Sequence, residues 1–353
     1  MSILWFLIVI GVIIFVHELG HFLAAKSVGM RVEKFSLGFP PKLKSFHHKG
    51  TEYSISAIPL GGYVKIAGMV DESLDPNAVT GAPWEFQSKK PWQKIWVLCA
   101  GVMMNALLAF ILFTVITKIN GVPQEGPVIV GGVEAGRPAE TVGLQAEDVI
   151  LSIDDQPIKT WQEFVDYIKT KPNQPIQLQW LRGLDTLQAT AVPDSREVTV
   201  GSQSITQGYL GVEFRPTFRT VSVFEAVGWG GVICWDVVRE SLKLIVKLIG
   251  GKASVSELTG PIGIAKLSGE SAKYGATSFL GFIGLISISI ALLNILPLPV
   301  LDGGHVLIVL IETAVRRTIS TRVKLVIQQI GFALLIVLVL VVSYHDILRL
   351  IVE

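Results

Sequence analysis

Two histidines and a glutamate lie within one helical turn of each other in the first apolar stretch of the chain. The motif is His17-Glu18-Leu19-Gly20-His21, and it interrupts an apolar run over residues 3–25. On a helix, His17 and His21 share one face because they are four residues apart. Two imidazoles so placed can bind one zinc ion, and Glu18 beside them can accept a proton from water. The pattern predicts a zinc hydrolase whose metal lies inside a membrane.

The cost of burying this cluster supports a functional interpretation. Ionisable side chains in a membrane-spanning helix are expensive and commonly mark functional sites. The competing interpretation is structural, with both histidines satisfied by helix neighbours and Glu18 facing a water pocket. The motif alone does not decide between the two, because a His-Glu-x-x-His pattern also arises by chance and needs confirming context. A third ligand elsewhere in the chain would provide that context.

The strongest candidate for the third ligand is Asp302. Catalytic zinc usually has three protein ligands and one open position. Asp302 ends the segment Asn294-Ile295-Leu296-Pro297-Leu298-Pro299-Val300-Leu301-Asp302, and two glycines follow it. A helix broken at membrane depth lines a cavity, and an aspartate there is expensive unless it binds a cation. His305 is the competing ligand, and Asp302 is favoured. The other histidines are interpreted as surface or interfacial: His47, His48 and His345.

The composition indicates a membrane protein with some soluble mass. Of the 353 residues, 50% are hydrophobic and 17% are charged, whereas an ordinary soluble domain has about 25% charged residues. Four apolar segments approach the ~20 residues that a spanning helix needs: about Ile3–Ala25, Ile95–Ile116, Phe279–Leu301 and Val326–Val342. We expect the first to be retained rather than cleaved as a signal peptide, because no basic region precedes it.

The distribution of lysine and arginine predicts the orientation. The segment from Lys26 to Lys94 holds ten basic residues against six acids, and the link between the last two spans adds four more basic residues. The positive-inside rule places both loops in the cytoplasm. Both chain termini and residues 120–278 then lie outside. Within that outer part, residues 221–249 are predicted to form an interfacial amphipathic helix, with a fifth span as the alternative.

The outer region also contains a segment typical of a small soluble domain, from Gly126 to about Phe214. Residues 128–130 and 176–180 alternate as strands do, and Thr160 is a plausible N-cap that forms a capping box with Glu163. The stretch 139–153 resembles a PDZ domain of the bacterial protease type. A PDZ domain binds extended peptide by strand addition, although the sequence does not locate the groove.

The order of these motifs resembles the site-2 protease family, of the M50 peptidase type and in particular its bacterial members that regulate sigma-E. The resemblance rests on His-Glu-Leu-Gly-His in the first span, a PDZ domain after the second, and Asn-x-x-Pro-x-Pro-x-Leu-Asp-Gly in the third. It implies that one zinc ion per chain is held by His17, His21 and Asp302, with Glu18 as the catalytic base. It also implies that Asn294, with Pro297 in the same motif, contacts the substrate.

Two departures from the family pattern are visible. The family often has Gly-Pro before the asparagine of the second span, whereas this chain has Gly101-Val102 and then Asn105. The proline kink is therefore in question, although Asn105 is still placed to bond between helices. Better-known relatives carry two PDZ domains in tandem, and the length here accommodates only one.

The cytoplasmic segment from Glu52 to Ile66 alternates like a β-hairpin around Gly61-Gly62. A small cytoplasmic sheet is one interpretation. The resemblance implies instead that the strand dips toward the active site and presents an edge to the substrate through Ile58, Gly61, Gly62 and Tyr63. A helical peptide hides its scissile carbonyl in its own hydrogen bonds, and pairing with an open edge would expose that carbonyl.

The sequence therefore predicts a polytopic α-helical membrane protein with four transmembrane helices, an inserted α+β PDZ domain and a small membrane-associated β-hairpin. Its parts are expected at residues 1–120 (first half of the protease core), 121–216 (periplasmic PDZ domain), 217–278 (amphipathic helix and connection) and 279–353 (second half of the core).

The expected activity is hydrolysis of peptide bonds within membrane spans. The expected location is a bacterial inner membrane, with the active site toward the cytoplasm. The expected partners are the lipid bilayer, previously trimmed single-pass proteins such as anti-sigma factors or remnant signal peptides, and a peptide ligand of the PDZ domain, but not nucleic acid. Two alternatives are a non-catalytic membrane-anchored PDZ scaffold and a zinc peptidase that cuts soluble loops at the membrane surface.

Overall fold

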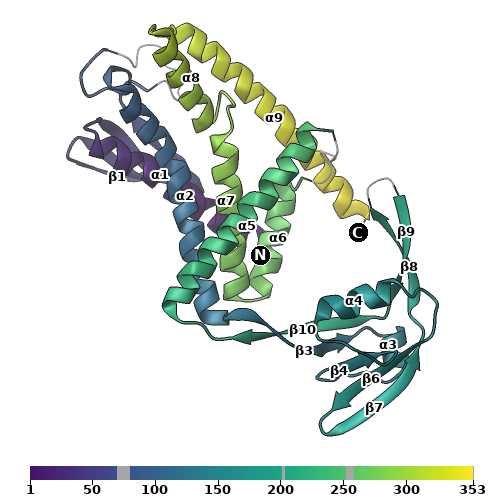
Figure 1. Ribbon diagram of the computed structural model, residues 1–353. Coiled ribbons are helices and arrows are strands. Elements are labelled where there is room, and N and C mark those ends of the chain that lie inside the picture. Colours follow the sequence, from purple (N-terminus) through teal and green to yellow (C-terminus); the bar gives the residue numbers. More distant parts are fainter. Residues whose placement is uncertain (70–79, 201–202, 252–257, 353) are drawn as a thin grey trace. The chain divides into compact units, whose positions relative to one another are not determined.

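The computed structural model describes residues 1–69, 80–200, 203–251 and 258–352, which form two compact units (Figure 1). Unit 1 comprises Met1–Ile119 and Ser222–Glu353, and unit 2 comprises Asn120–Val221. Unit 2 is thus an insertion between two halves of unit 1. His17, Glu18, His21 and Asp302 all belong to unit 1.

Unit 1 is mainly helical. Its described helices are α1 (Ser2–Ser27), α2 (Pro91–Asn120, whose last residue belongs to unit 2), α5 (Val223–Ile249), α6 (Pro261–Lys273), α7 (Ala276–Ile295), α8 (Asp302–Val315) and α9 (Thr321–Val352). In the described chain, four of them are long and apolar enough to cross a membrane, namely α1, α2, α7 and α9. These are the four expected spans, each with somewhat different ends. The charged helix α5 is not among them, and it begins with a capping box between Ser222 and Glu225.

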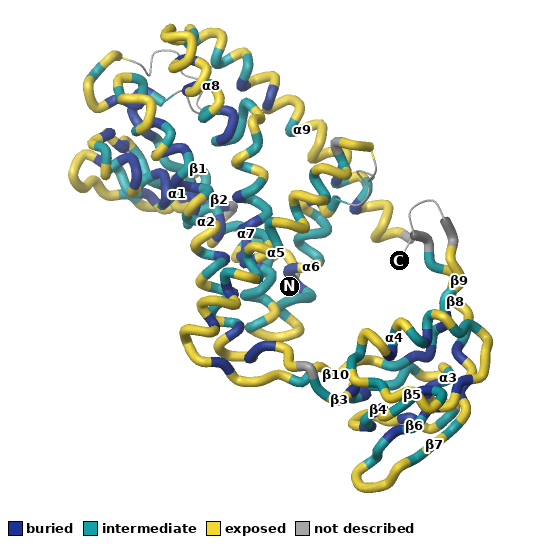
Figure 2. Tube along the Cα trace, in the orientation of Figure 1, coloured by how far each residue is buried: buried dark blue, intermediate teal, exposed yellow. Residues whose placement is uncertain are grey.

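Three of the apolar helices pack together around one buried seam. Val9 and Ile13 of α1 and Ile283 of α7 form an apolar cluster, which partly buried side chains of α2 cover. A second cluster joins Ala109 and Phe113 of α2 to α7 and to the apolar face of α5. By contrast, α9 has much of its apolar surface exposed (Figure 2), as a lipid-facing helix would. The α1–α2–α7 seam is the part of the fold that positions the candidate site.

The third expected span is interrupted earlier than the sequence indicated. Helix α7 ends at Ile295, not at Leu301, and residues 296–301 are non-helical before α8 begins at Asp302. The prolines explain the break, because proline has no N–H to continue the helix. Gly303 and Gly304 allow α8 to start against the end of α7. A Cβ atom would approach the Ile295 carbonyl oxygen to 2.2 Å at Gly303 and the Leu298 carbonyl oxygen to 2.1 Å at Gly304.

The segment after α1 forms a sheet from β1 (Val32–His48) and β2 (Thr51–Ile66), followed by the short 3-10 helix η2 (Phe86–Ser88). The predicted hairpin turn at Gly61-Gly62 is wrong. The two strands reverse at Lys49-Gly50, where both residues have positive φ (48° and 76°), as a two-residue hairpin turn of type I′ requires. Residue Lys34 pairs with both Glu52 and Lys65. The first part of β1 therefore lies between two parts of β2.

Gly61 and Gly62 are needed for close packing rather than for a turn. A Cβ atom on Gly61, whose φ is +117°, would meet the Ile14 side chain of α1 at 2.7 Å. A Cβ atom on Gly62 would meet the Ser36 carbonyl oxygen at 2.3 Å. The alternating pattern found the strand correctly, but a glycine pair at a close approach looks the same in sequence as a glycine pair in a turn. The last part of β2 thus packs directly on α1.

Unit 2 is built around a six-stranded sheet with strand order β10-β3-β4-β6-β7 and with β5 paired to β4. Its elements are β3 (Val122–Val133), α3 (Pro138–Thr141), β4 (Val149–Ile153), β5 (Gln156–Pro157), α4 (Trp161–Lys169), β6 (Ile176–Arg182), β7 (Asp185–Ala191) and β10 (Val212–Arg219). A separate hairpin consists of β8 (Asp194–Val200) and β9 (Gln203–Tyr209). The predicted strands at 128–130 and 176–180 are confirmed, as is the capping box between Thr160 and Glu163.

Candidate metal centre

The two histidines of the motif face the same point from α1. Both side chains are buried, and their Nε2 atoms lie 3.1 Å apart. The other ring nitrogen of His21 is fixed from α2, because its Nδ1 atom lies 2.8 Å from the Val97 carbonyl oxygen. A carbonyl oxygen only accepts hydrogen bonds, so Nδ1 of His21 carries the proton and Nε2 presents its lone pair. This is the tautomer that a metal ligand needs.

Asp302 joins these histidines from a segment almost 300 residues away in the sequence. Its Oδ2 atom lies 3.1 Å from Nε2 of His17 and 3.5 Å from Nε2 of His21. The carboxylate stands in the first turn of α8, where the helix dipole favours a negative charge. Oδ2 is buried and has no hydrogen-bond partner in the part of the chain that the structure describes. A buried carboxylate oxygen in that state is expected to have a cation as its partner.

The spacing of the three atoms fits a tetrahedral zinc site. Ligand bonds of 2.0–2.1 Å in tetrahedral geometry put neighbouring ligand atoms about 3.3 Å apart, and the three distances here are 3.1, 3.1 and 3.5 Å. His17, His21 and Asp302 are also the group of potential metal donors found among the described residues. The donor set, two imidazoles and one carboxylate, is typical of catalytic zinc.

Helix α2 leaves room at this point because it has a glycine there. A Cβ atom on Gly101 would lie 2.5 Å from Nε2 of His21 and 2.7 Å from Nε2 of His17. Any side chain would therefore occupy the space into which both imidazoles point. Sequence reasoning noted Gly101 only for the missing proline after it. The contact that gives this glycine a role depends on how α1 and α2 face each other.

Glu18 lies beside the donors and is held by the sheet. Its Oε2 atom accepts a hydrogen bond of 3.0 Å from the backbone N–H of Val64 in β2. Val64 pairs with Phe35 on its other side, so the last part of β2 bridges between the sheet and α1. The strand that sequence analysis expected near the site is thus in contact with the expected base.

The predicted substrate-contacting residues fall into two groups. Asn294, in the last turn of α7, has its Nδ2 atom 3.4 Å from Nε2 of His17, so its side chain adjoins the metal donors. Pro297 lies in the non-helical segment that follows and is exposed. Among the β2 residues, Ile58 is 41% exposed and Tyr63 is partly exposed and stacks on Phe39.

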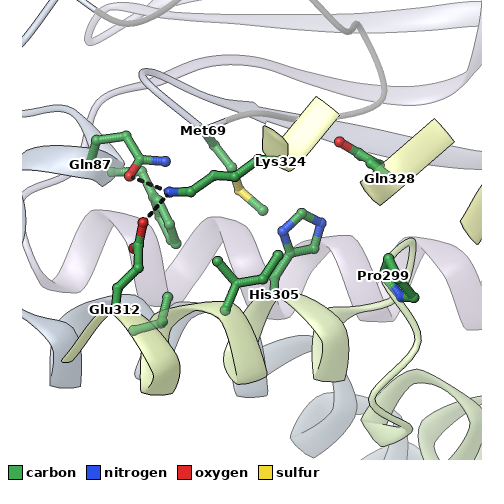
Figure 3. Close-up of a pocket in the computed structure, with 10 residues that line it drawn as sticks. Met69, Gln87, Pro299, His305, Glu312, Lys324 and Gln328 are labelled. Atoms are coloured by element: carbon green, nitrogen blue, oxygen red, sulfur yellow. Dashed lines mark hydrogen bonds and ion pairs between the residues drawn. The ribbon is translucent and has the colours of Figure 1, made fainter. Parts of the chain in front are cut away.

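His305, the competing third ligand, belongs to different surroundings. It lines a separate pocket between α8, α9 and the segment around η2, together with Met69, Pro299 and Gln328 (Figure 3). At the other end of that pocket, Nζ of Lys324 forms an ion pair of 2.8 Å with Oε1 of Glu312. His305 and Asp302 are three residues apart on α8, yet only Asp302 joins the two α1 histidines in the donor group described above.

The family of the chain follows from sequence comparison. The profile of peptidase family M50 matches residues 5–338. The chain belongs to this family. A Rhizobium meliloti protein, named as a proposed zinc metalloprotease, is 34% identical over 97% of this chain and 95% of its own length. Protease RseP of Yersinia pestis is 30% identical over 99% of this chain and 100% of its own length. This chain is accordingly a zinc metalloprotease.

Two further results concern the length of one relative and a match to one solved domain. The alignment with the Yersinia pestis protease extends over 458 positions, whereas this chain has 353 residues, so that relative contains residues without a counterpart here. Among solved structures, the PDZ domain of the SdrC-like protein from Listeria monocytogenes matches 26% of this chain and 90% of that domain, with 29% identity and a TM-score of 0.21.

Proposed function

We propose that this protein cleaves peptide bonds within the membrane spans of single-pass membrane proteins. The observation that carries the proposal is the convergence of His17, His21 and Asp302 at distances of 3.1–3.5 Å, at the seam of three apolar helices. Two segments from opposite ends of the chain supply these donors. Ionisable groups in such a place are costly, and binding a divalent cation is the chemistry that compensates them.

The proposed ligands are Nε2 of His17, Nε2 of His21 and Oδ2 of Asp302, which would hold one zinc ion per chain. When bound there, zinc supplies a Lewis acid that acidifies water and polarises a carbonyl group. Glu18 would act as general base: it takes a proton from the attacking water and passes it to the leaving amine. The N–H of Val64 keeps the Glu18 carboxylate oriented toward the donors.

Substrate recognition would combine an amide and a strand edge. Asn294 adjoins His17, and an amide can both donate to and accept from the backbone of an unwound peptide. Near the same point, residues 61–66 of β2 form the sheet boundary that packs on α1. An extended substrate segment paired along this region would exchange its helical hydrogen bonds for inter-strand ones and expose its scissile carbonyl. Ile58, Gly61, Gly62, Tyr63 and Pro297 are the proposed flanking contacts.

The placement in the cell is also part of the proposal. The excess of lysine and arginine before α2 and between α8 and α9 favours a cytoplasmic location for these loops, in an inner membrane with both termini and unit 2 outside. In the described residues of unit 2, β10 is an end strand of the sheet, and α4 is the longer of the two helices. We propose that it is a PDZ domain that filters or docks substrates, such as anti-sigma factors or remnant signal peptides whose outer part has been removed.

Replacement of Glu18 by glutamine tests the catalytic assignment. The purified Glu18→Gln protein is expected to retain zinc and its fold but to lose cleavage of a model single-span substrate by about 10²–10⁴-fold, the usual contribution of general base catalysis. Cleavage is measured in detergent with and without a chelator, and zinc content by elemental analysis. Wild-type turnover in the zinc-loaded variant would exclude Glu18 as the base.

Mapping the products by mass separates the proposal from its alternatives. Cleavage inside the apolar segment of the substrate supports intramembrane proteolysis, whereas cuts confined to flanking loops favour a peptidase of the membrane surface. The His21→Ala variant serves as the metal control and is expected to lose zinc. A wild-type protein without zinc and without activity would support a scaffold role for unit 2 instead.

A further inference from the structure

We propose that Asn105 positions the zinc ligand His17 by accepting a hydrogen bond from its Nδ1–H group. This inference rests on the zinc site proposed above. Asn105 lies on α2, is fully buried, and has its side-chain amide 3.4 Å from Nδ1 of His17. It would give His17 the same support that the Val97 carbonyl gives to His21.

The argument starts from the spacing along α2. One stripe of α2 contains residues that lie four positions apart: Val97, Gly101 and Asn105. The stripe runs along His17 and His21 of α1, which are also four residues apart. At one end the Val97 carbonyl oxygen contacts Nδ1 of His21 at 2.8 Å. In the middle, Gly101 leaves space at both Nε2 atoms. At the other end, Asn105 contacts Nδ1 of His17.

The protonation of His17 decides which amide atom of Asn105 must face it. A histidine that binds metal through Nε2 carries its proton on Nδ1 and usually donates it to an oxygen. In the structure the Asn105 amide turns Nδ2 toward His17, and its Oδ1 atom is buried without a hydrogen-bond partner among the described residues. Nitrogen and oxygen of an amide are distinguished only by their hydrogen bonds. Reversal of the amide makes Oδ1 the acceptor of the His17 proton and removes it from its unpartnered position.

The backbone around Asn105 is held independently of its side chain. The hydroxyl of Ser287 in α7 donates a hydrogen bond of 2.8 Å to the main-chain carbonyl of Asn105. Ser287 is itself fully buried. This contact fixes the distance between α2 and α7 at the level of the site but does not touch His17. It therefore offers a matched control for any effect of helix packing.

The experiment measures zinc affinity in the detergent-solubilised full-length protein by competition with a chelating dye. Asn105→Leu keeps the branching and the number of side-chain heavy atoms but has no acceptor, and it is expected to bind zinc 10–100-fold more weakly, the usual cost of losing an outer-shell partner. Asn105→Asp restores an acceptor and is expected to stay within about threefold of wild type. Ser287→Ala is expected to bind zinc as the wild type does. The visible absorption of the Co²⁺-substituted proteins should shift in Asn105→Leu alone.

Three results would overturn the inference: wild-type zinc affinity in Asn105→Leu, equal weakening in Asn105→Leu and Ser287→Ala, or failure of Asn105→Asp to recover binding. The first would remove any role in metal binding, the second would assign the effect to helix packing, and the third would show that an acceptor is not what His17 needs. A separate failure, zinc binding undiminished in His21→Ala, would refute the metal site itself and is distinguishable from all three.

Discussion

Two carboxylates, Asp148 in unit 2 and Asp302 in unit 1, differ in how their charge is balanced. In unit 2, Asp148 is almost fully buried and accepts hydrogen bonds from Nε and Nη2 of Arg182 and from the Gln145 N–H group. The hydrogen bond with Asp148 raises the pKa of Arg182. In unit 1, Oδ2 of Asp302 lies 3.1 Å from Nε2 of His17 and 3.5 Å from Nε2 of His21, and it finds no hydrogen-bond partner among the described residues. A buried carboxylate that is paired with an arginine and N–H donors of the chain is part of the fold. A buried carboxylate without such partners indicates a site that binds a cation.

The largest expected effect comes from removing the carboxylate of Asp302. Asp302→Ala should abolish cleavage and weaken zinc binding by more than about a hundredfold, the upper end of the cost of losing an outer-shell partner. The metal-free variant should unfold no more easily than the wild type, because a buried charge without a cation has been removed. Zinc affinity and denaturation in detergent measure both quantities.

The matched variant in unit 2 should behave in the opposite way. Asp148→Ala is expected to keep zinc and its cleavage of a model single-span substrate, while unit 2 becomes easier to digest with protease. If Asp302→Ala destabilised the metal-free protein as much as Asp148→Ala does, the contrast between the two carboxylates would be wrong.

A second prediction concerns the space around the donors. Gly101→Ala places a Cβ atom 2.5 Å from Nε2 of His21 and is expected to lower zinc affinity at least about tenfold, as a disturbed ligand orientation does. Gly281→Ala in α7 is the control, since its Cβ atom would meet only Ile116, at 3.7 Å. Alanine favours helix over glycine, so helix propensity cannot explain a loss. Equal zinc affinity in both variants would contradict the assigned role of Gly101.

The sequence predicted the donors of unit 1 and an interhelical bond at Asn105, but it did not indicate that Asn105 and Gly101 lie against the two histidines. His17 and His21 are identifiable because imidazoles four apart in an apolar helix have few other uses, and Asp302 because a carboxylate beside a broken helix is costly. Gly101 and Asn105 act through the contact of α1 with α2. Both helices are apolar around most of their circumference, so periodicity does not tell which face meets which partner. That information exists only in the packed structure.

Other differences have local causes. Glycine pairs occur both in turns and where two backbones approach closely. For this reason the hairpin turn was predicted at Gly61-Gly62, whereas the strands reverse at Lys49-Gly50. The helix α6 and the hairpin β8–β9 lie in polar or short segments with weak periodicity, and neither was predicted. By contrast, helix α4 was predicted from the capping box of Thr160 and Glu163 and from the apolar residues that follow at helical spacing, because both are local signals that do not depend on the rest of the fold.

The smallest expected effect comes from removing the cation that balances Asp148. Arg182→Leu leaves that carboxylate buried without its partner, and we expect unit 2 to lose stability because an unpaired buried charge is costly. The loss is limited because the arginine side chain is 36% exposed. Hydrogen exchange of residues 120–221 in the full-length protein measures this loss. Zinc affinity should not change.

The double variant sharpens the same test. Replacing both Arg182 and Asp148 by leucine removes the unpaired charge together with its former partner, so much of the lost protection should return. The return need not be complete, because the Gln145 N–H group also loses its acceptor. If Arg182→Leu left exchange in unit 2 unchanged, then a balanced charge would not be what distinguishes Asp148 from Asp302, and the unpartnered state of Asp302 would lose its value as a sign of cation binding.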